Sequence, residues 1–265
     1  MIISIINSLS EQGQKYYSLR HMCPWLERIR QEVKDLNVYA IRLKLYFLAD
    51  IPLNKIQSKV TDFLDQSFAR EPAFLERHEQ NTFKNYVFDY PYPGEADRIY
   101  RKGKIYTLTV RTIEPLLAKY FSEVSVNCYT QEIKGLTADI RILPKKCIQT
   151  LYTLTPVILK DSEGYWRSQK SLSYFEERLK TNLIKKWNQF EKVKLQEDFP
   201  LYTMLEFLNA GPIVVEYKNI RLLGDKIRLQ IADNERAQAL AYMSLGTGLL
   251  EMNSRGAGFV NYRWL

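Results

Sequence analysis

The sequence of 265 residues predicts an α+β protein made of two tandem ferredoxin-like domains, each a split βαβ unit with an RRM-like topology. Residues 37–145 give the order strand, helix, strand, strand, helix, strand when their apolar positions are compared with the periods of strands and helices. Residues 146–265 resemble the same order, although no sequence repeat is visible. We therefore expect an N-terminal helical extension at 1–36 and two domains at 37–145 and 146–265, which Pro144-Lys-Lys146 separates.

The elements expected in the first two segments follow from local patterns. Ile41, Leu43 and Leu45 alternate with polar residues, which predicts a half-buried strand at 39–48. A turn then leads into a helix that runs from Asn54 to about Phe68. The remaining predicted elements are helices at 24–36, 72–78 and 113–121, strands at 83–90 and 124–143, and a hairpin at 99–106 with Gly103 at its turn.

In the second domain the clearest element is a helix at 171–190. Its apolar residues recur at helical spacing and form one stripe of Leu172, Phe175, Leu179, Leu183, Trp187 and Phe190. The other predicted elements are strands at 148–159 and 213–217, a hairpin at 219–231 over Gly224-Asp225, a helix at 233–244 and a strand at the C-terminal end.

The composition restricts the partners and the compartment. Lys and Arg number 38 against 30 Asp and Glu, and this formal charge of +8 suits a polyanion such as nucleic acid. No apolar run reaches the roughly 18 residues of a membrane span. Cys23, Cys128 and Cys147 are odd in number and widely scattered, which argues against a disulfide framework or a zinc site. We therefore expect a cytoplasmic protein that does not contact a membrane.

The C-terminal glycine segment (residues 246–258) is the strongest candidate for a binding site. It contains four of the eleven glycines, and a polar run separates the two pairs. Glycine adopts positive φ readily, successive amides in such a turn can bind an anion, and arginine adds a planar contact to phosphate. The alternative is a glycine-rich hairpin without a ligand. The candidate residues are Gly246, Gly248, Asn253, Ser254, Arg255, Gly256 and Gly258.

The catalytic candidates come from two histidines, His21 and His78. Neither has a partner at metal-ligand spacing, and the sequence has no Walker loop or serine-hydrolase motif, so we expect no metal and no cofactor. A histidine can transfer a proton to or from an RNA 2′-hydroxyl, and a lysine such as Lys84 can stabilise negative charge on phosphorus. An isolated histidine is more often a surface or structural residue, which is the interpretation we keep for His21.

Two stretches resemble the CRISPR-associated repeat-processing endoribonucleases, the Cas-six family. Residues 251–260, Glu-Met-Asn-Ser-Arg-Gly-Ala-Gly-Phe-Val, resemble the second half of that family's glycine-rich loop. Residues 74–88 resemble the stretch in which the family carries its catalytic histidine and lysine, and the match assigns these positions to His78 and Lys84.

Two features depart from the family's pattern. The linker between Gly248 and Gly256 is longer, so either Leu249 and Leu250 are an insertion or Leu250 stands where a glycine is expected. Many members also carry an active-site tyrosine on the first helix, whereas residues 59–63 have none and offer only Thr61.

The resemblance implies a metal-independent endoribonuclease that cuts CRISPR precursor RNA by 2′-hydroxyl attack, leaves a 2′,3′-cyclic phosphate and retains the guide RNA. It also implies a monomer or homodimer that can join other subunits of an effector complex. Four basic residues of the second domain are further candidates for phosphate contacts, although a solvated face explains them equally well: Arg167, Lys170, Lys185 and Lys186. Two alternatives stay open, namely an inactive subunit that binds repeat RNA and a general tandem RNA-recognition protein.

Overall fold

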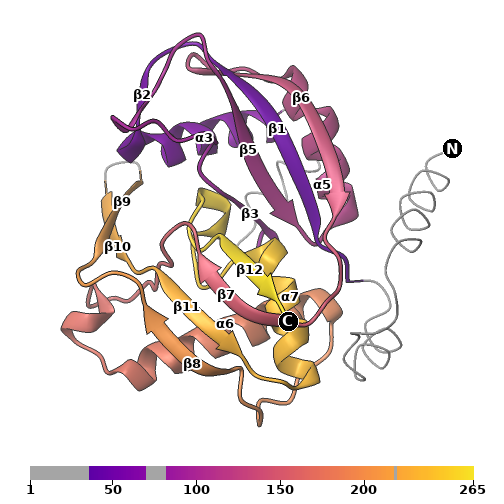
Figure 1. Cartoon of the computed structure of the whole chain (residues 1–265), viewed down its shortest axis with the longest axis vertical. Coiled ribbons are helices and arrows are strands. Elements are labelled where there is room, and N and C mark those ends of the chain that lie inside the picture. Colours follow the sequence, from indigo (N-terminus) through magenta and orange to yellow (C-terminus); the bar gives the residue numbers. More distant parts are fainter. Residues whose placement is uncertain (1–35, 70–81, 218–219) are drawn as a thin grey trace, which may run out of the picture.

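The structure, a computed structural model, describes residues 36–69, 82–217 and 220–265 (Figure 1). It has an α+β fold with two four-stranded antiparallel sheets, as predicted. Figure 1 shows helices α3 and α5 behind the first sheet and α6 behind the second. The helices predicted at 24–36 and 72–78 lie outside the described residues, apart from Leu36.

The first sheet has the order β3-β5-β1-β6, and two helices pack on one of its faces. In β1 the alternation of apolar residues buries Ile41, Leu43 and Leu45, as predicted, and helix α3 covers them with Ile56 and Phe63. The bounds are β1 Tyr39–Phe47, α3 Leu53–Phe68, β3 Tyr86–Phe88, β5 Ile105–Thr112, α5 Pro115–Glu123 and β6 Ile133–Ile142. A 3₁₀ turn, η2 Ser125–Asn127, precedes β6, so the strand predicted at 124–143 begins later.

The second sheet has the order β12-β7-β11-β8, with α6 and α7 against one face. Helix α6 begins after Ser171, whose hydroxyl accepts a hydrogen bond from the Tyr174 amide, and buries the predicted stripe around Phe175 and Leu179. The bounds are β7 Ile148–Thr153, η3 Trp166–Ser168, α6 Leu172–Glu191, β8 Tyr202–Phe207, β11 Ile227–Ile231, α7 Glu235–Thr247, η4 Asn253–Arg255 and β12 Val260–Trp264. The strand β8 was not predicted.

Both predicted hairpins are wrong in their pairing. Strand β4 (Ile99–Tyr100) pairs with β2 (Ile51–Pro52), and β10 (Ile220–Gly224) pairs with β9 (Ile213–Tyr217). In each case the expected partner already has a strand on both sides: β5 lies between β3 and β1, and β11 lies between β7 and β8. One neighbour in each case, β1 or β7, comes from a distant part of the chain, so the local turn signals could not reveal it.

The two halves of the chain share packing at their junction. Ile113 and Leu143 of the first half belong to the apolar core of the second half. The Arg111 guanidinium donates to the Val260 carbonyl at 2.7 Å and lies 4.4 Å from the centroid of the Phe259 ring. The hydroxyl of Tyr242 donates to the Leu143 carbonyl at 2.7 Å. The junction therefore fixes the C-terminal end of the chain against the first sheet.

Two sequence expectations concern membranes and thiols. No helix among residues 36–69, 82–217 and 220–265 is long and apolar enough to cross a membrane. Cys128 is a buried free thiol.

Candidate functional site

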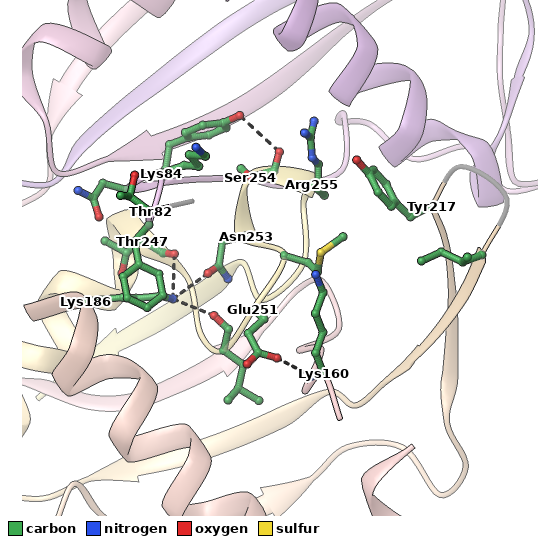
Figure 2. A pocket seen from close by; sticks show the side chains of 16 residues that line it. Thr82, Lys84, Lys160, Lys186, Tyr217, Thr247, Glu251, Asn253, Ser254 and Arg255 are labelled. Atoms are coloured by element: carbon green, nitrogen blue, oxygen red, sulfur yellow. Dashed lines mark hydrogen bonds between the residues drawn. The ribbon is translucent and has the colours of Figure 1, made fainter. Parts of the chain in front are cut away.

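A cleft of about 450 Å³ lies between the start of β3 and the glycine segment (Figure 2). It brings Lys84 of the first half together with Asn253, Ser254 and Arg255 of the second half. The residues that line it are Thr82, Phe83, Lys84, Asn85, Tyr86, Lys160, Lys186, Tyr217, Ile220, Thr247, Leu250, Glu251, Met252, Asn253, Ser254 and Arg255. The structure therefore brings candidate residues from two distant stretches onto one surface.

The first two glycines, Gly246 and Gly248, do not both lie in a loop. Gly246 lies inside α7, and a Cβ there would stand 2.8 Å from Cγ2 of Ile113, so this glycine permits close packing of α7 on the first half. The expectation that Gly246 belongs to the loop was wrong. Gly248 ends the helix with a φ of +72°, in the left-handed half of conformational space that favours glycine.

The second glycine pair closes the turn. Gly256 and Gly258 have φ values of +85° and +69°. A Cβ on Gly258 would stand 2.2 Å from the Leu249 carbonyl oxygen, and one on Gly256 would stand 2.6 Å from the Phe88 ring. The Gln57 amide of α3 donates to the Gly256 carbonyl at 2.7 Å. Both glycines therefore serve the fold of the segment itself and its contact with the first half.

Leu250 lies in the linker between Gly248 and Gly256, which is longer than in the family's pattern. It has a φ of +53° and is only 1% exposed. A leucine therefore adopts a conformation that usually belongs to glycine, at a cost of about 1–2 kcal/mol. Met252 also has a positive φ, of +60°, and Leu249 donates its amide to the Gly258 carbonyl.

Asn253 holds the segment together from inside. Its Nδ2 donates to the carbonyl oxygens of Leu249 and Ala257 at 2.9 and 3.0 Å. Its Oδ1 accepts from the Lys186 ammonium at 2.7 Å. The side chain is therefore committed to the protein, and only the backbone of Asn253 is available to a ligand.

Lys186 is buried rather than solvated, at 2% exposure, so it cannot be the surface phosphate contact that the sequence allowed. Its Nζ donates to the carbonyl oxygens of Gly248 and Leu250 at 2.8 and 3.0 Å, and the Thr247 carbonyl oxygen lies at 3.4 Å. Figure 2 shows this ammonium inside the curve of the segment. Burial lowers the pKa of Lys186 to about 7, while the ring of oxygen acceptors favours the protonated form.

The residues of the glycine segment that line the cleft include backbone donors without an acceptor in the described part of the chain. Among the described residues, the backbone amides of Met252, Asn253 and Ser254 donate to no protein acceptor. The Arg255 guanidinium is ion-paired with Asp65 of α3 and lies 5.5 Å from the centroid of the Tyr217 ring. Successive amides beside a guanidinium form a place for an anionic group.

The other basic candidates lie apart from the cleft. Arg167 is paired at 2.8 Å with the buried Asp225 and rests on the Phe207 ring, and Lys170 is paired at 2.8 Å with Glu163. Lys185 is exposed on α6. None of these three lines the cleft. Thr61 is buried within α3 and does not line it either.

Lys84 lies just after a backbone contact between the halves. The Phe83 amide donates to Oε1 of Gln189, and Nε2 of Gln189 donates to the Phe83 carbonyl, both at 3.3 Å. His78 lies outside the described residues, so its predicted role stays a prediction. The described residues contain no group of three or more His, Cys, Asp or Glu side chains that could hold a metal ion.

The sequence missed three side chains at this site. Tyr86 is buried on β3 and donates its hydroxyl to the Ser254 carbonyl at 3.4 Å, and Lys160 and Tyr217 also line the cleft. Tyr86 carried a weak signal, because it belongs to a predicted strand. Nothing in the local sequence around Lys160 or Tyr217 distinguishes them, since only the packing of the two halves brings them here.

Comparison with known proteins gives a family and a fold. The protein-family model described as "CRISPR associated protein Cas6, C-terminal" matches residues 143–262. No curated protein matches the chain at a significant level.

Among solved structures, one described as "CRISPR associated protein Cas6" has a TM-score of 0.58 and 21% identity, covering 85% of this chain and 99% of that one. A second, "An RAMP protein binding different RNA substrates", has a TM-score of 0.62 and 15% identity, with coverages of 85% and 99%. A third, a Cas6-related protein from Pyrococcus furiosus, has a TM-score of 0.59 and 18% identity, with coverages of 85% and 98%.

The structural similarity to these proteins shows a shared fold, which is the tandem ferredoxin-like fold that the sequence predicted. Residues 143–262 therefore match the Cas6 C-terminal family, and the chain as a whole shares its fold with Cas6 structures.

Proposed function

We propose that this protein is an endoribonuclease that binds CRISPR repeat RNA, cuts precursor transcripts into guide RNAs and keeps the product bound. The observation that carries the proposal is the cleft that joins Lys84 to the donor-rich face of the glycine segment. Proteins of the Cas6 family are typically endoribonucleases that process CRISPR RNA. One of the similar structures is also described as a protein that binds different RNA substrates.

The proposed reaction is an internal transesterification that requires no metal ion. The 2′-oxygen attacks the adjacent phosphorus, a new O–P bond forms, and the bond from phosphorus to the 5′-oxygen breaks. The products are a 2′,3′-cyclic phosphate and a 5′-hydroxyl. We assign to His78 the transfer of a proton from the 2′-hydroxyl or to the leaving 5′-oxygen, because imidazole titrates near neutral pH. We assign to Lys84 the stabilisation of the negative charge that develops on the phosphoryl oxygens.

We propose that the cleft holds the RNA backbone near the bond that is cut. The amides of Met252, Asn253 and Ser254 supply directional donors, and Arg255 and Lys160 supply positive charge at the same surface. Half or more of protein contacts to nucleic acid usually go to phosphate and sugar, so such a surface positions RNA without reading its sequence. The exposed Lys185 adds charge at a distance from the cleft and is a weaker candidate.

The proposal is tested by incubating wild-type protein and His78→Ala with the cognate repeat RNA in EDTA and measuring cleavage and binding separately. A matched RNA with a single 2′-deoxy nucleotide at the cut site lacks the nucleophile. We expect wild type to cut only the all-ribose RNA, to leave a cyclic phosphate and to bind both RNAs equally. We expect His78→Ala to bind both RNAs without cutting.

Each other outcome has a definite meaning. Equal cutting by His78→Ala would move the chemistry to His21 or to a tyrosine–lysine centre. Binding without cutting by either protein would make this an RNA-holding subunit of an effector complex. Equal binding to an unrelated RNA of the same length would favour a general RNA-recognition protein. The absence of any binding would contradict the proposal.

A further inference from the structure

We infer that Lys186 and Gln189, on neighbouring turns of helix α6, are positioning residues that set the place of Lys84 relative to the glycine segment. This inference rests on the proposed function, because it assigns a consequence for cleavage to the two contacts. Neither side chain is proposed to take part in a bond-making step. The two contacts are those of Lys186 with the glycine segment and of Gln189 with the backbone of Phe83.

Helix α6 carries a polar stripe beside its apolar one. The residues at this stripe are spaced by three or four positions, so they lie on one face of the helix: Arg178, Asn182, Lys186 and Gln189. The Arg178 guanidinium donates to Oε1 of Glu251 in the glycine segment at 2.8 Å. The stripe therefore contacts the segment near one end and the start of β3 near the other.

Lys186 fixes the glycine segment at the middle of this stripe. Its ammonium donates to the carbonyl oxygens of Gly248 and Leu250 and to the side chain of Asn253. Burying a charge without such partners costs several kcal/mol, so the segment and the ammonium require each other. The carbonyls of Gly248 and Leu250 accept from Lys186, whereas the amides of Met252, Asn253 and Ser254 donate to no acceptor among the described residues and belong to residues that line the cleft.

Gln189 fixes the backbone one residue before Lys84. Its amide gives one donor and one acceptor to the N–H and C=O of Phe83, a two-point contact that defines the direction of the chain there. The Phe83 ring centroid also lies 5.8 Å from the Lys186 ammonium. One helix therefore holds both walls of the cleft, and the spacing between them depends on two adjacent turns of α6.

A carboxamide at position 189 is needed for this contact. Glutamate could accept from the Phe83 amide but could not donate to the Phe83 carbonyl, and alanine could do neither. Gln189 is exposed and does not line the cleft, so its removal leaves the core and the RNA-facing surface unchanged. Misplacement of a charge-stabilising lysine by a fraction of an ångström lowers the rate of the chemical step more than it lowers affinity.

The test compares wild type with Gln189→Ala, Gln189→Glu and Gln131→Glu. The last variant adds the same charge at an exposed turn away from the cleft and is the matched control. Single-turnover cleavage of repeat RNA and the Kd for the same RNA are measured for each protein. Hydrogen exchange of residues 82–86 is measured without RNA. We expect both Gln189 variants to cut about tenfold more slowly at a Kd within threefold of wild type, with faster exchange at 82–86.

The outcomes separate the inference from the proposed function. Cleavage at the wild-type rate by Gln189→Ala would overturn the inference and leave the proposed function intact. A parallel loss of affinity and rate would also overturn it, since a positioning role acts on the rate. If wild type does not cut, the proposed function fails, and the inference is then decided by exchange: unchanged exchange at 82–86 in both Gln189 variants would overturn it.

Discussion

The Arg255 guanidinium in the glycine segment forms an ion pair with the Asp65 carboxylate on helix α3, 190 positions earlier in the chain. The side chain of Arg255 is 20% exposed and that of Asp65 is 36% exposed, so the pair is partly buried, and Arg255 also lines the cleft. An RNA phosphate that approaches Arg255 therefore competes with a carboxylate that the protein already supplies. The same side chain, Arg255, therefore holds the glycine segment against α3 and is the proposed contact to phosphate.

We predict that Asp65→Asn tightens the binding of repeat RNA about three- to tenfold, because the substitution removes a negative charge that lies beside Arg255 and would repel the phosphate. Fluorescence anisotropy at two salt concentrations measures this effect. Asp62→Asn is the matched control, since it makes the same change of charge one turn earlier on α3, where the side chain is 57% exposed. Weaker binding by Asp65→Asn than by Asp62→Asn would show that the ion pair holds the segment in its binding shape instead.

The neighbouring lysines of α6 should differ sharply in their effect on stability. We predict that Lys186→Met lowers the free energy of unfolding by about 2–4 kcal/mol, because buried carbonyl oxygens of the glycine segment lose their donor. Lys185→Met changes the same residue type on the exposed face, and we expect a change within about 0.5 kcal/mol. Urea denaturation of the two variants measures the difference. Equal effects would contradict the buried position of Lys186.

The turn of the glycine segment should not tolerate a side chain at Gly258. Alanine there would need a positive φ and would place its Cβ 2.2 Å from the Leu249 carbonyl oxygen. We predict a loss of about 2 kcal/mol or more in the free energy of unfolding. Gly211→Ala is the control, because nothing lies within 4 Å of the place that a Cβ would occupy there. A Gly258→Ala protein as stable as Gly211→Ala would mean that the turn has a different backbone.

Asp89, at the end of β3, should make stability fall as the pH rises. Burial raises the pKa of Asp89 from 3.8 to about 6. Between these values the folded protein keeps a proton that the unfolded chain releases, so stability is lost as the pH rises through the window and the loss is complete above about 6. We predict that the stability of Asp89→Asn relative to wild type increases by about 1 kcal/mol between pH 5 and pH 8. A constant difference across this range would contradict the raised pKa.

The elements with strong periodicity could be predicted well from the sequence. Ile41, Leu43 and Leu45 defined β1, and the stripe around Phe175 and Leu179 defined α6 nearly to its ends. Strand pairing could not be predicted in the same way. Strands β4 and β10 lie beside good turns, yet both edges of β5 and β11 are occupied, in each case by one strand from earlier in the same region and one from far along the chain, β1 or β7. Such competition is non-local and leaves no trace in a short window of sequence.

The two segments that line the cleft could be singled out from the sequence, whereas their meeting in one cleft could not. The sequence indicated both walls of the cleft, through Lys84 and the glycine segment, but it treated Lys185 and Lys186 alike. A signal was present, because Lys186 follows Asn182 and Leu183 at helical spacing on the buried side, whereas Lys185 points outward. Arg167 illustrates the opposite limit, since its partner Asp225 is brought to it only by the tertiary fold.

We propose that RNA is cut in the cleft beside Lys84, and single-turnover cleavage by Lys84→Ala is the sharpest test. The matched control is Lys102→Ala, which removes an exposed lysine beside the Gly103 turn. We predict that Lys84→Ala lowers the cleavage rate about a hundredfold or more while the Kd for repeat RNA stays within about threefold, and that Lys102→Ala changes neither. A Lys84→Ala protein that cuts as fast as Lys102→Ala would contradict the account.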